Sequence, residues 1–248
     1  LFLEGFARPL EGVRVILRVL LAKYRAAGGE RRMKCGVQRI EARAGRAHAL
    51  VLDDGTEVTA RHVISSIGAP ETERLIMGDV PAGVGPTPPG RLSFVETITV
   101  LNREPTAFGW GDDTIVFFND SERFEYASPQ ADVDTRSGVI CLPNNFDYGA
   151  GKSLPEGLLR VTCLARPDVW SAWPEDEYRA AKGRWFTAVQ DSARRFLPLP
   201  MGAVTPEAAV VATDMFTPRT ITRYTGHFGG AIYGSPVKNR HGRTALDN

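Results

Sequence analysis

The pattern of apolar and polar positions is most regular between residues 10 and 68. Apolar side chains recur there at spacings of three and four residues, which predicts a helix with one buried face, formed by Val13, Leu17, Leu20, Leu21 and Tyr24. Basic residues fall largely between these positions and can stay in water. Gly28 and Gly29 then end the helix, because glycine accepts the left-handed backbone that a helix C-cap requires.

The period of the pattern changes after Gly29. Short apolar runs at residues 37–40, at 50–52 and at Val58 are separated by turn residues, which predicts a hairpin or a three-stranded meander. The pair Asp54-Gly55 is a turn signal between two of these runs, because Asp-Gly readily adopts positive φ. The run VISSIG, residues 63–68, is mostly apolar and carries no charge, which predicts a strand covered on both faces.

The second half of the chain has the pattern of an antiparallel sheet. Residues 70–78 favour a short helix, and the dense Pro and Gly residues at 80–90 are interpreted as a crossing between domains. Apolar runs separated by polar turns then predict strands at residues 92–102, 114–119, 138–143, 158–165 and 208–213. One long helix is expected at 175–196, with an apolar stripe of Tyr178, Trp185, Val189, Ala193 and Phe196. The fold class predicted is therefore α/β, of the α+β kind.

Composition narrows the classes of function. The chain of 248 residues has a formal net charge of +1 and its arginines are dispersed, so nothing indicates a nucleic-acid partner. No apolar run approaches the ~20 residues of a membrane-spanning helix. Cys35, Cys141 and Cys163 are isolated and lack metal-ligand spacing, which favours free thiols in a reducing, cytoplasmic compartment.

The last segment, residues 215–248, has the most unusual composition. Its stretch GHFGGAIYG, residues 226–234, contains too much glycine for a helix or a regular strand. Glycine at this density permits close approach of the backbone to a ligand or to another segment. A plain surface loop is the alternative, but Phe228, Ile232 and Tyr233 are apolar and fit a loop tip poorly.

These features, in this order, resemble the middle of FAD-dependent oxidoreductases of the phytoene desaturase and retinol saturase type, in the amine-oxidase-like flavoprotein superfamily. The matching residues are Gly28-Gly29-Glu30, Val37, Ile40, Val51, Asp54-Gly55, Ala60 and Val63-Ile64-Ser65. Residues 216–238, FTPRTITRYTGHFGGAIYGSPVK, resemble the segment that precedes the final flavin-binding stretch of the same family. The resemblance therefore covers both ends of the chain.

The resemblance implies a division of the chain and a cofactor, FAD. Residues 1–80 would form part of an FAD-binding domain, residues 81–213 an inserted antiparallel-sheet substrate domain, and residues 214–248 a return segment toward the FAD-binding domain. By the same resemblance, the backbone of Val37 would contact the adenine and Ser65 would end a strand near it. Gly229, Gly230 and Tyr233 would lie near the flavin ring or the substrate entrance. For each of these residues, a purely structural role is the alternative.

Two departures from the family pattern matter. The glycine motif G-x-G-x-x-G, which places a pyrophosphate on a helix N-terminus, is absent, and so is the closing stretch rich in glycine and small residues. We therefore expect an internal fragment of a longer flavoprotein, which by itself binds FAD weakly.

The resemblance implies desaturation or saturation of C–C bonds in a hydrophobic isoprenoid or carotenoid-like substrate. In such a reaction the cofactor supplies the chemistry while the protein orients the substrate and excludes water. No triad or carboxylate pair stands out, so the catalytic residues stay unassigned; His227 beside the glycine loop is the acid–base candidate to test. An amine-oxidase-like enzyme and an inactive fragment are the alternatives, and peripheral membrane contact is compatible with a polyene substrate.

Overall fold

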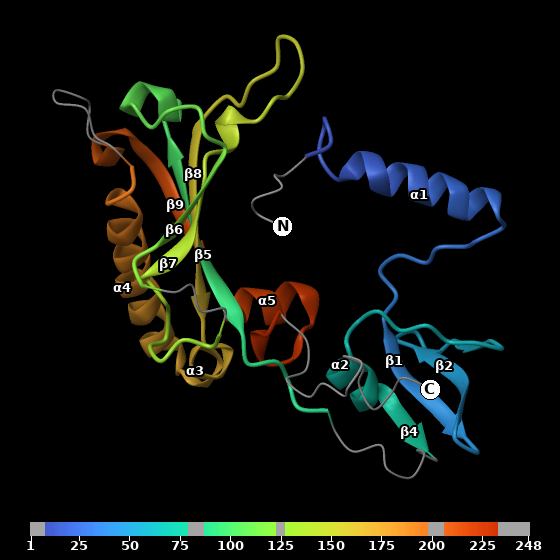
Figure 1. Cartoon of the computed structure of the whole chain (residues 1–248). Coiled ribbons are helices and arrows are strands. Elements are labelled where there is room, and N and C mark those ends of the chain that lie inside the picture. Colours follow the sequence, from blue (N-terminus) through green and yellow to red (C-terminus); the bar gives the residue numbers. More distant parts are fainter. Residues whose placement is uncertain (1–7, 79–86, 123–126, 198–205, 233–248) are drawn as a thin grey trace.

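The computed structural model describes residues 8–78, 87–122, 127–197 and 206–232, which form two sheets with flanking helices (Figure 1). Sheet A, the four-stranded sheet, has the order β3-β2-β1-β4, and sheet B, the five-stranded sheet, has the order β6-β7-β8-β5-β9. The mixed α/β fold class with an antiparallel sheet is thereby confirmed. The domain boundaries stay a prediction.

Sheet A is built around the predicted hairpin. β1 (Val37–Arg43) pairs antiparallel with β2 (Arg46–Leu52), and β2 pairs antiparallel with β3 (Glu57–Thr59). The two-residue turn between β1 and β2 has positive φ at both Ala44 and Gly45, as a tight hairpin requires. β4 (Ile76–Gly78) then pairs with β1 in parallel after the short helix α2 (Ala69–Leu75).

The predicted buried strand at residues 63–68 is wrong. These residues form no helix or strand, and the side chain of Ile64 is 94% exposed. A strand covered on both faces needs neighbours at its edges and layers above and below it. Among the described residues it is β4 that occupies the place beside β1, and no layer covers residues 63–68.

The predicted helix near the N-terminus forms, but its predicted buried face does not. α1 (Arg14–Ala26) contains no buried residue, and Val13, Leu17 and Leu20 are all exposed. Figure 1 shows α1 standing apart from both sheets, so none of the described elements covers its apolar face. The residues just before the helix reach sheet B's side of the molecule, where Glu11 pairs with Lys152 at 3.5 Å.

Sheet B has the five predicted strands, all antiparallel. They are β5 (Ser93–Leu101), β6 (Ile115–Asn119), β7 (Ser137–Cys141), β8 (Gly157–Ala165) and β9 (Val210–Phe216). Burial alternates strictly along β5, because successive side chains point to opposite faces. Short 3₁₀ turns connect the strands: η2 (Pro105–Phe108), η3 (Pro143–Asn145) and η4 (Pro206–Ala209).

The core lies between sheet B and the helix α4 (Glu175–Arg194), with α3 (Pro167–Ala172) at one end. Val189 and Ala193 of the predicted stripe are buried, Tyr178 and Trp185 pack on the core, and Phe196 stacks on Phe118 with ring centroids 4.8 Å apart. Further along the chain follow α5 (Pro218–Thr225) and the 3₁₀ turn η5 (Phe228–Gly230).

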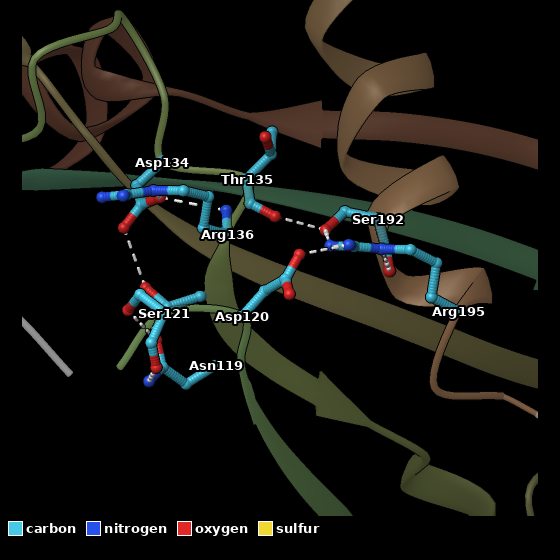
Figure 2. Close-up of polar contacts among 9 residues, drawn as sticks. Asn119, Asp120, Ser121, Asp134, Thr135, Arg136, Ser192 and Arg195 are labelled. Carbon is cyan, nitrogen blue, oxygen red and sulfur yellow. Dashed lines mark hydrogen bonds and ion pairs between the residues drawn. The ribbon is translucent and has the colours of Figure 1, made fainter. Parts of the chain in front are cut away.

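A polar network fixes the C-terminal end of α4 to the loops of β6 and β7 (Figure 2). Arg195 forms an ion pair with Asp120, while the Ser192 hydroxyl donates to the backbone carbonyl of Thr135. The backbone N–H of Arg136 donates to Asp134 Oδ1 at 3.0 Å. Because these carboxylates are occupied by backbone and arginine partners, the network is structural. No group of three His, Cys, Asp or Glu side chains within the described ranges could hold a metal ion.

Candidate functional site

The face of sheet B that points away from α4 is the first part of the candidate site. Gln190 of α4 donates to the Thr97 hydroxyl at 2.7 Å, which shows that the odd-numbered residues of β5 point toward the helix. The even-numbered side chains, beginning with Phe94 and Glu96, therefore point to the opposite face. We call this the open face; it is formed on the two central strands by Phe94, Glu96, Ile98, Val100, Leu158, Arg160, Thr162 and Leu164.

The open face is mainly apolar and only partly covered. Phe94 of β5 and Phe216 of β9 stack with ring centroids 5.6 Å apart and an interplanar angle of 7°. Cys141 of β7 lies opposite Arg160 in the sheet register. Burial raises the pKa of the Cys141 thiol, while the Arg160 charge acts in the opposite direction, so this position behaves as a small apolar side chain.

One ion pair interrupts this apolar surface. Glu96 Oε1 accepts from Nε of Arg160 at 3.0 Å and from Nη2 at 2.5 Å, and Glu96 Oε2 accepts from the Thr162 hydroxyl at 3.0 Å. The side chain of Glu96 is 15% exposed and that of Arg160 is 44% exposed. The carboxylate is thus satisfied, whereas Nη1 of Arg160 has no hydrogen-bond partner among the described residues. The guanidinium is held in a fixed orientation with one nitrogen available to an oxygen atom.

The glycine turn η5 packs against the start of β5, at one end of sheet B. The Ser93 hydroxyl donates to the carbonyl oxygen of Gly230 at 2.6 Å, and the N–H of Ile232 donates to the carbonyl of Leu92 at 3.1 Å. Gly230 has a φ of 74°, and a Cβ atom there would lie 2.3 Å from the carbonyl oxygen of Pro218. Only glycine allows this close approach, which explains one glycine of the unusual segment.

Glu71 joins this turn to α2 of the sheet-A part. Its Oε1 accepts from the backbone N–H of Phe228 at 2.6 Å and lies 3.5 Å from Nδ1 of His227. The Arg74 guanidinium lies over the Phe228 ring at 3.1 Å from the centroid. Two segments far apart in the chain therefore meet here, and His227 has a carboxylate partner near this end of sheet B.

The structure places Ser65, Gly229 and Gly230 in the region of α2 and η5, whereas Val37 lies apart from them. Ser65 belongs to the α2 region, since its hydroxyl lies 2.7 Å from that of Thr72. Gly229 is next to Gly230 in η5, and its carbonyl accepts from the Ser171 hydroxyl at 3.0 Å. Val37 is half-buried at the start of β1, opposite Leu52, away from these contacts.

Tyr233 lies outside the described residues. Cofactor contacts of the other four predicted residues stay predictions.

Sequence reasoning missed Glu96, Arg160 and Glu71. A signal for the first two was present: each is a charge inside an otherwise apolar strand, in SFVETITVL and GLLRVTCLA. Two opposite charges of this kind in neighbouring strands indicate a cross-strand pair. Glu71 gave no such signal, because its partner lies 157 positions away.

Comparison with known proteins agrees with the family resemblance. The chain is 26% identical over 160 residues to hydroxyneurosporene desaturase of Rubrivivax gelatinosus, covering 63% of this chain and 30% of that protein. It is also similar to the crystal structure of an oxidoreductase from Methanosarcina mazei, with a TM-score of 0.49 and 15% identity over 83% of this chain and 42% of that one. No protein-family model matches. The chain thus spans less than half of either relative.

Similarity to this desaturase confirms the resemblance to phytoene-desaturase-type flavoprotein oxidoreductases. Among the helices in the described ranges, none is long and apolar enough to cross a membrane.

Proposed function

We propose that this chain is part of an FAD-dependent oxidoreductase that desaturates or saturates C–C bonds of a hydrophobic, isoprenoid or carotenoid-like substrate. The observation that carries the proposal is the open face of sheet B, an extended apolar surface whose two central strands hold the Glu96–Arg160 ion pair. Similarity to a hydroxyneurosporene desaturase supports this class of substrate.

Two features of the chain fit a flavin nucleotide. β4 pairs with β1 only from Ile40 to Ala42, so the edge of β1 around Val37 has no partner strand on that side among the described residues. A backbone edge of this kind can hydrogen-bond a purine ring. In η5, a Cβ atom built on Gly229 would meet nothing within 4 Å, so this backbone is open to close approach by a planar group. When bound, FAD would supply the hydride acceptor or donor.

In the proposed reaction, the chain's own residues bind and orient the substrate. Phe94, Phe216 and Ile98 would cover the hydrocarbon and exclude water from it. Arg160, held by Glu96, would donate a hydrogen bond to an oxygen atom on the substrate and so fix its position along the sheet. His227, next to Glu71, would exchange a proton at the end of sheet B where η5 lies.

FAD titration of the purified chain tests the cofactor part of the proposal. We expect weak binding by the 248 residues alone, because they lack a glycine motif that would hold the pyrophosphate. Flavin fluorescence should show tight binding once the chain carries a dinucleotide-binding segment of its family. An extended chain that still leaves flavin fluorescence unchanged would refute an FAD enzyme.

Binding of all-trans-retinol, followed by its fluorescence, tests the substrate face independently of the flavin. Ile98→Ser on the open face should weaken binding, whereas Val211→Ser on the exposed part of β9 is the matched control and should not. Arg160→Met should weaken retinol binding about 10- to 100-fold, because a hydrogen bond from a charged donor contributes about 1.5–3 kcal/mol. The control Arg136→Met removes an exposed guanidinium that pairs with Asp134 at 3.5 Å. Equal affinities in all four variants would show that the open face does not bind the polyene.

A further inference from the structure

A cavity lies between sheet B and α4. It has no role in the proposed reaction, and the side chains of the core leave it unfilled. Its volume is about 150 Å³, and it lies on the side of the sheet opposite to the open face. Leu101 and Leu159 of the sheet and Phe186 and Ala193 of α4 contribute apolar walls. An apolar cavity of about this volume in another protein stays dry and holds a benzene molecule.

Two buried polar atoms on the walls of this cavity have no partner. Thr99 and Trp110 both line it and are 5% and 6% exposed, and neither Thr99 Oγ1 nor Trp110 Nε1 has a hydrogen-bond partner in the described part of the chain. Buried polar atoms in native proteins almost always have a partner. An indole N–H can only donate, so the missing partner of Trp110 must be an acceptor.

Gln190 adds an acceptor to the same cavity. Its amide nitrogen donates to the Thr97 hydroxyl at 2.7 Å, which orients the side chain and leaves its carbonyl oxygen without a partner among the described residues. The cavity therefore offers one fixed donor, one hydroxyl that can act either way, and one acceptor. A hydroxyl group, which both donates and accepts, satisfies this set.

Charges at the rim determine the net charge of a suitable ligand. Arg194 pairs with Asp191 at 3.0 Å and with Glu207 at 2.6 Å, so two carboxylates surround one guanidinium. This arrangement leaves the guanidinium occupied and gives the rim an excess of negative charge. An anionic ligand is disfavoured by repulsion and by the loss of its hydration.

We propose that this cavity is a binding site for a small neutral alcohol with an apolar body of about six carbon atoms, a size judged from the benzene-sized cavity. The hydroxyl oxygen accepts from Trp110 Nε1 and its hydrogen is donated to Gln190 or Thr99. The ring packs against Leu101, Leu159 and Phe186. The site is independent of the flavin and of the open face.

Cyclohexanol is the probe, titrated into the ¹⁵N-labelled chain while the indole N–H signals of the 4 tryptophans are followed by NMR. We expect a saturable shift of the Trp110 signal with a Kd of the order of 1 mM, typical of a ligand with so few atoms. Cyclohexanecarboxylate, the anionic analogue, should not bind.

Trp110→Phe keeps an aromatic ring and removes the donor, and should weaken binding of cyclohexanol about 3- to 10-fold, as expected for one lost hydrogen bond. Trp173→Phe, outside the cavity, is the matched control and should leave the affinity unchanged. If Trp110→Phe fails to fold, Thr99→Val, which nearly preserves the shape, gives the same comparison. Absence of a saturable shift would mean that water alone fills the cavity and would overturn the proposal. Equal affinity in Trp110→Phe, Thr99→Val and the unaltered chain would also overturn it.

Discussion

Replacement of Gly230 by alanine should destabilise the protein far more than the same change at its neighbour Gly229. Both glycines have positive φ, 74° and 65°, so each alanine adopts a left-handed conformation that costs about 1–2 kcal/mol. Only at position 230 does the new Cβ collide with backbone, 2.3 Å from the carbonyl oxygen of Pro218. At position 229 it meets nothing within 4 Å.

The collision determines how far the two variants differ in their free energy of unfolding. Relief of the contact requires η5 to move away from α5, which stretches the 2.6 Å hydrogen bond from Ser93 to Gly230. Loss of that buried bond costs about 1 kcal/mol, and the backbone shift adds to it. We therefore expect Gly230→Ala to lower the free energy of unfolding by about 2–4 kcal/mol and Gly229→Ala by about 1–2 kcal/mol, with the larger loss at Gly230. Alanine also restricts the unfolded chain, but this effect is common to both variants and cancels in the comparison.

Urea denaturation followed by tryptophan fluorescence measures this difference. The two variants should share the m-value of the parent and differ in midpoint, since the surface exposed on unfolding is unchanged. Equal midpoints for Gly229→Ala and Gly230→Ala would refute the close packing of η5 on α5. A drop in the FAD affinity of Gly229→Ala, measured where that variant is fully folded, would indicate a contact with the cofactor.

Three further predictions concern the rest of the fold. Burial raises the pKa of the Cys163 thiol to about 12 from the ordinary 9.0. Between these two pH values the unfolded chain binds fewer protons than the folded chain, so the free energy of unfolding falls as the pH rises. Cys163→Ala should remove this contribution to the pH dependence of urea denaturation. Ile64→Ser should change the free energy of unfolding by less than about 0.5 kcal/mol, whereas Ile140→Ala in the core should lower it by about 2–5 kcal/mol. A large loss of stability in Ile64→Ser would show that residues 63–68 are buried after all. Thr217→Ala removes the half of the α5 capping box in which the Thr217 hydroxyl oxygen accepts from the backbone N–H of Thr220, and should lower the thermal midpoint by the equivalent of about 0.5–2 kcal/mol. An unchanged midpoint would show that this cap contributes nothing.

Elements that depend on local pattern could be predicted from the sequence. The alternation along β5 and β8, the three- and four-residue spacing of α4, and the Asp54-Gly55 turn each correspond to what the structure shows. Period and turn chemistry act over a few neighbouring residues, so one sequence is sufficient to read them. The resemblance to a flavoprotein family also rests on such local runs.

Burial of an element was decided only by its tertiary surroundings. The apolar stripe of α1 and the run at residues 63–68 have the composition of buried segments, yet Leu20 and Ile64 are exposed. An apolar face is buried only where another element covers it, and its own sequence does not say which element that is.

The candidate site is likewise a product of topology. Ser93 and Gly230 are 137 positions apart, and Glu71 and Phe228 are 157 apart, yet each pair forms a hydrogen bond near one end of sheet B. Glu96 and Arg160 meet because β5 and β8 are neighbours in register. The sequence alone determined most of the segments that form strands and helices, but not the run at residues 63–68. The order of the strands in the sheet decided which of their side chains meet, because that order depends on the packing of the whole chain.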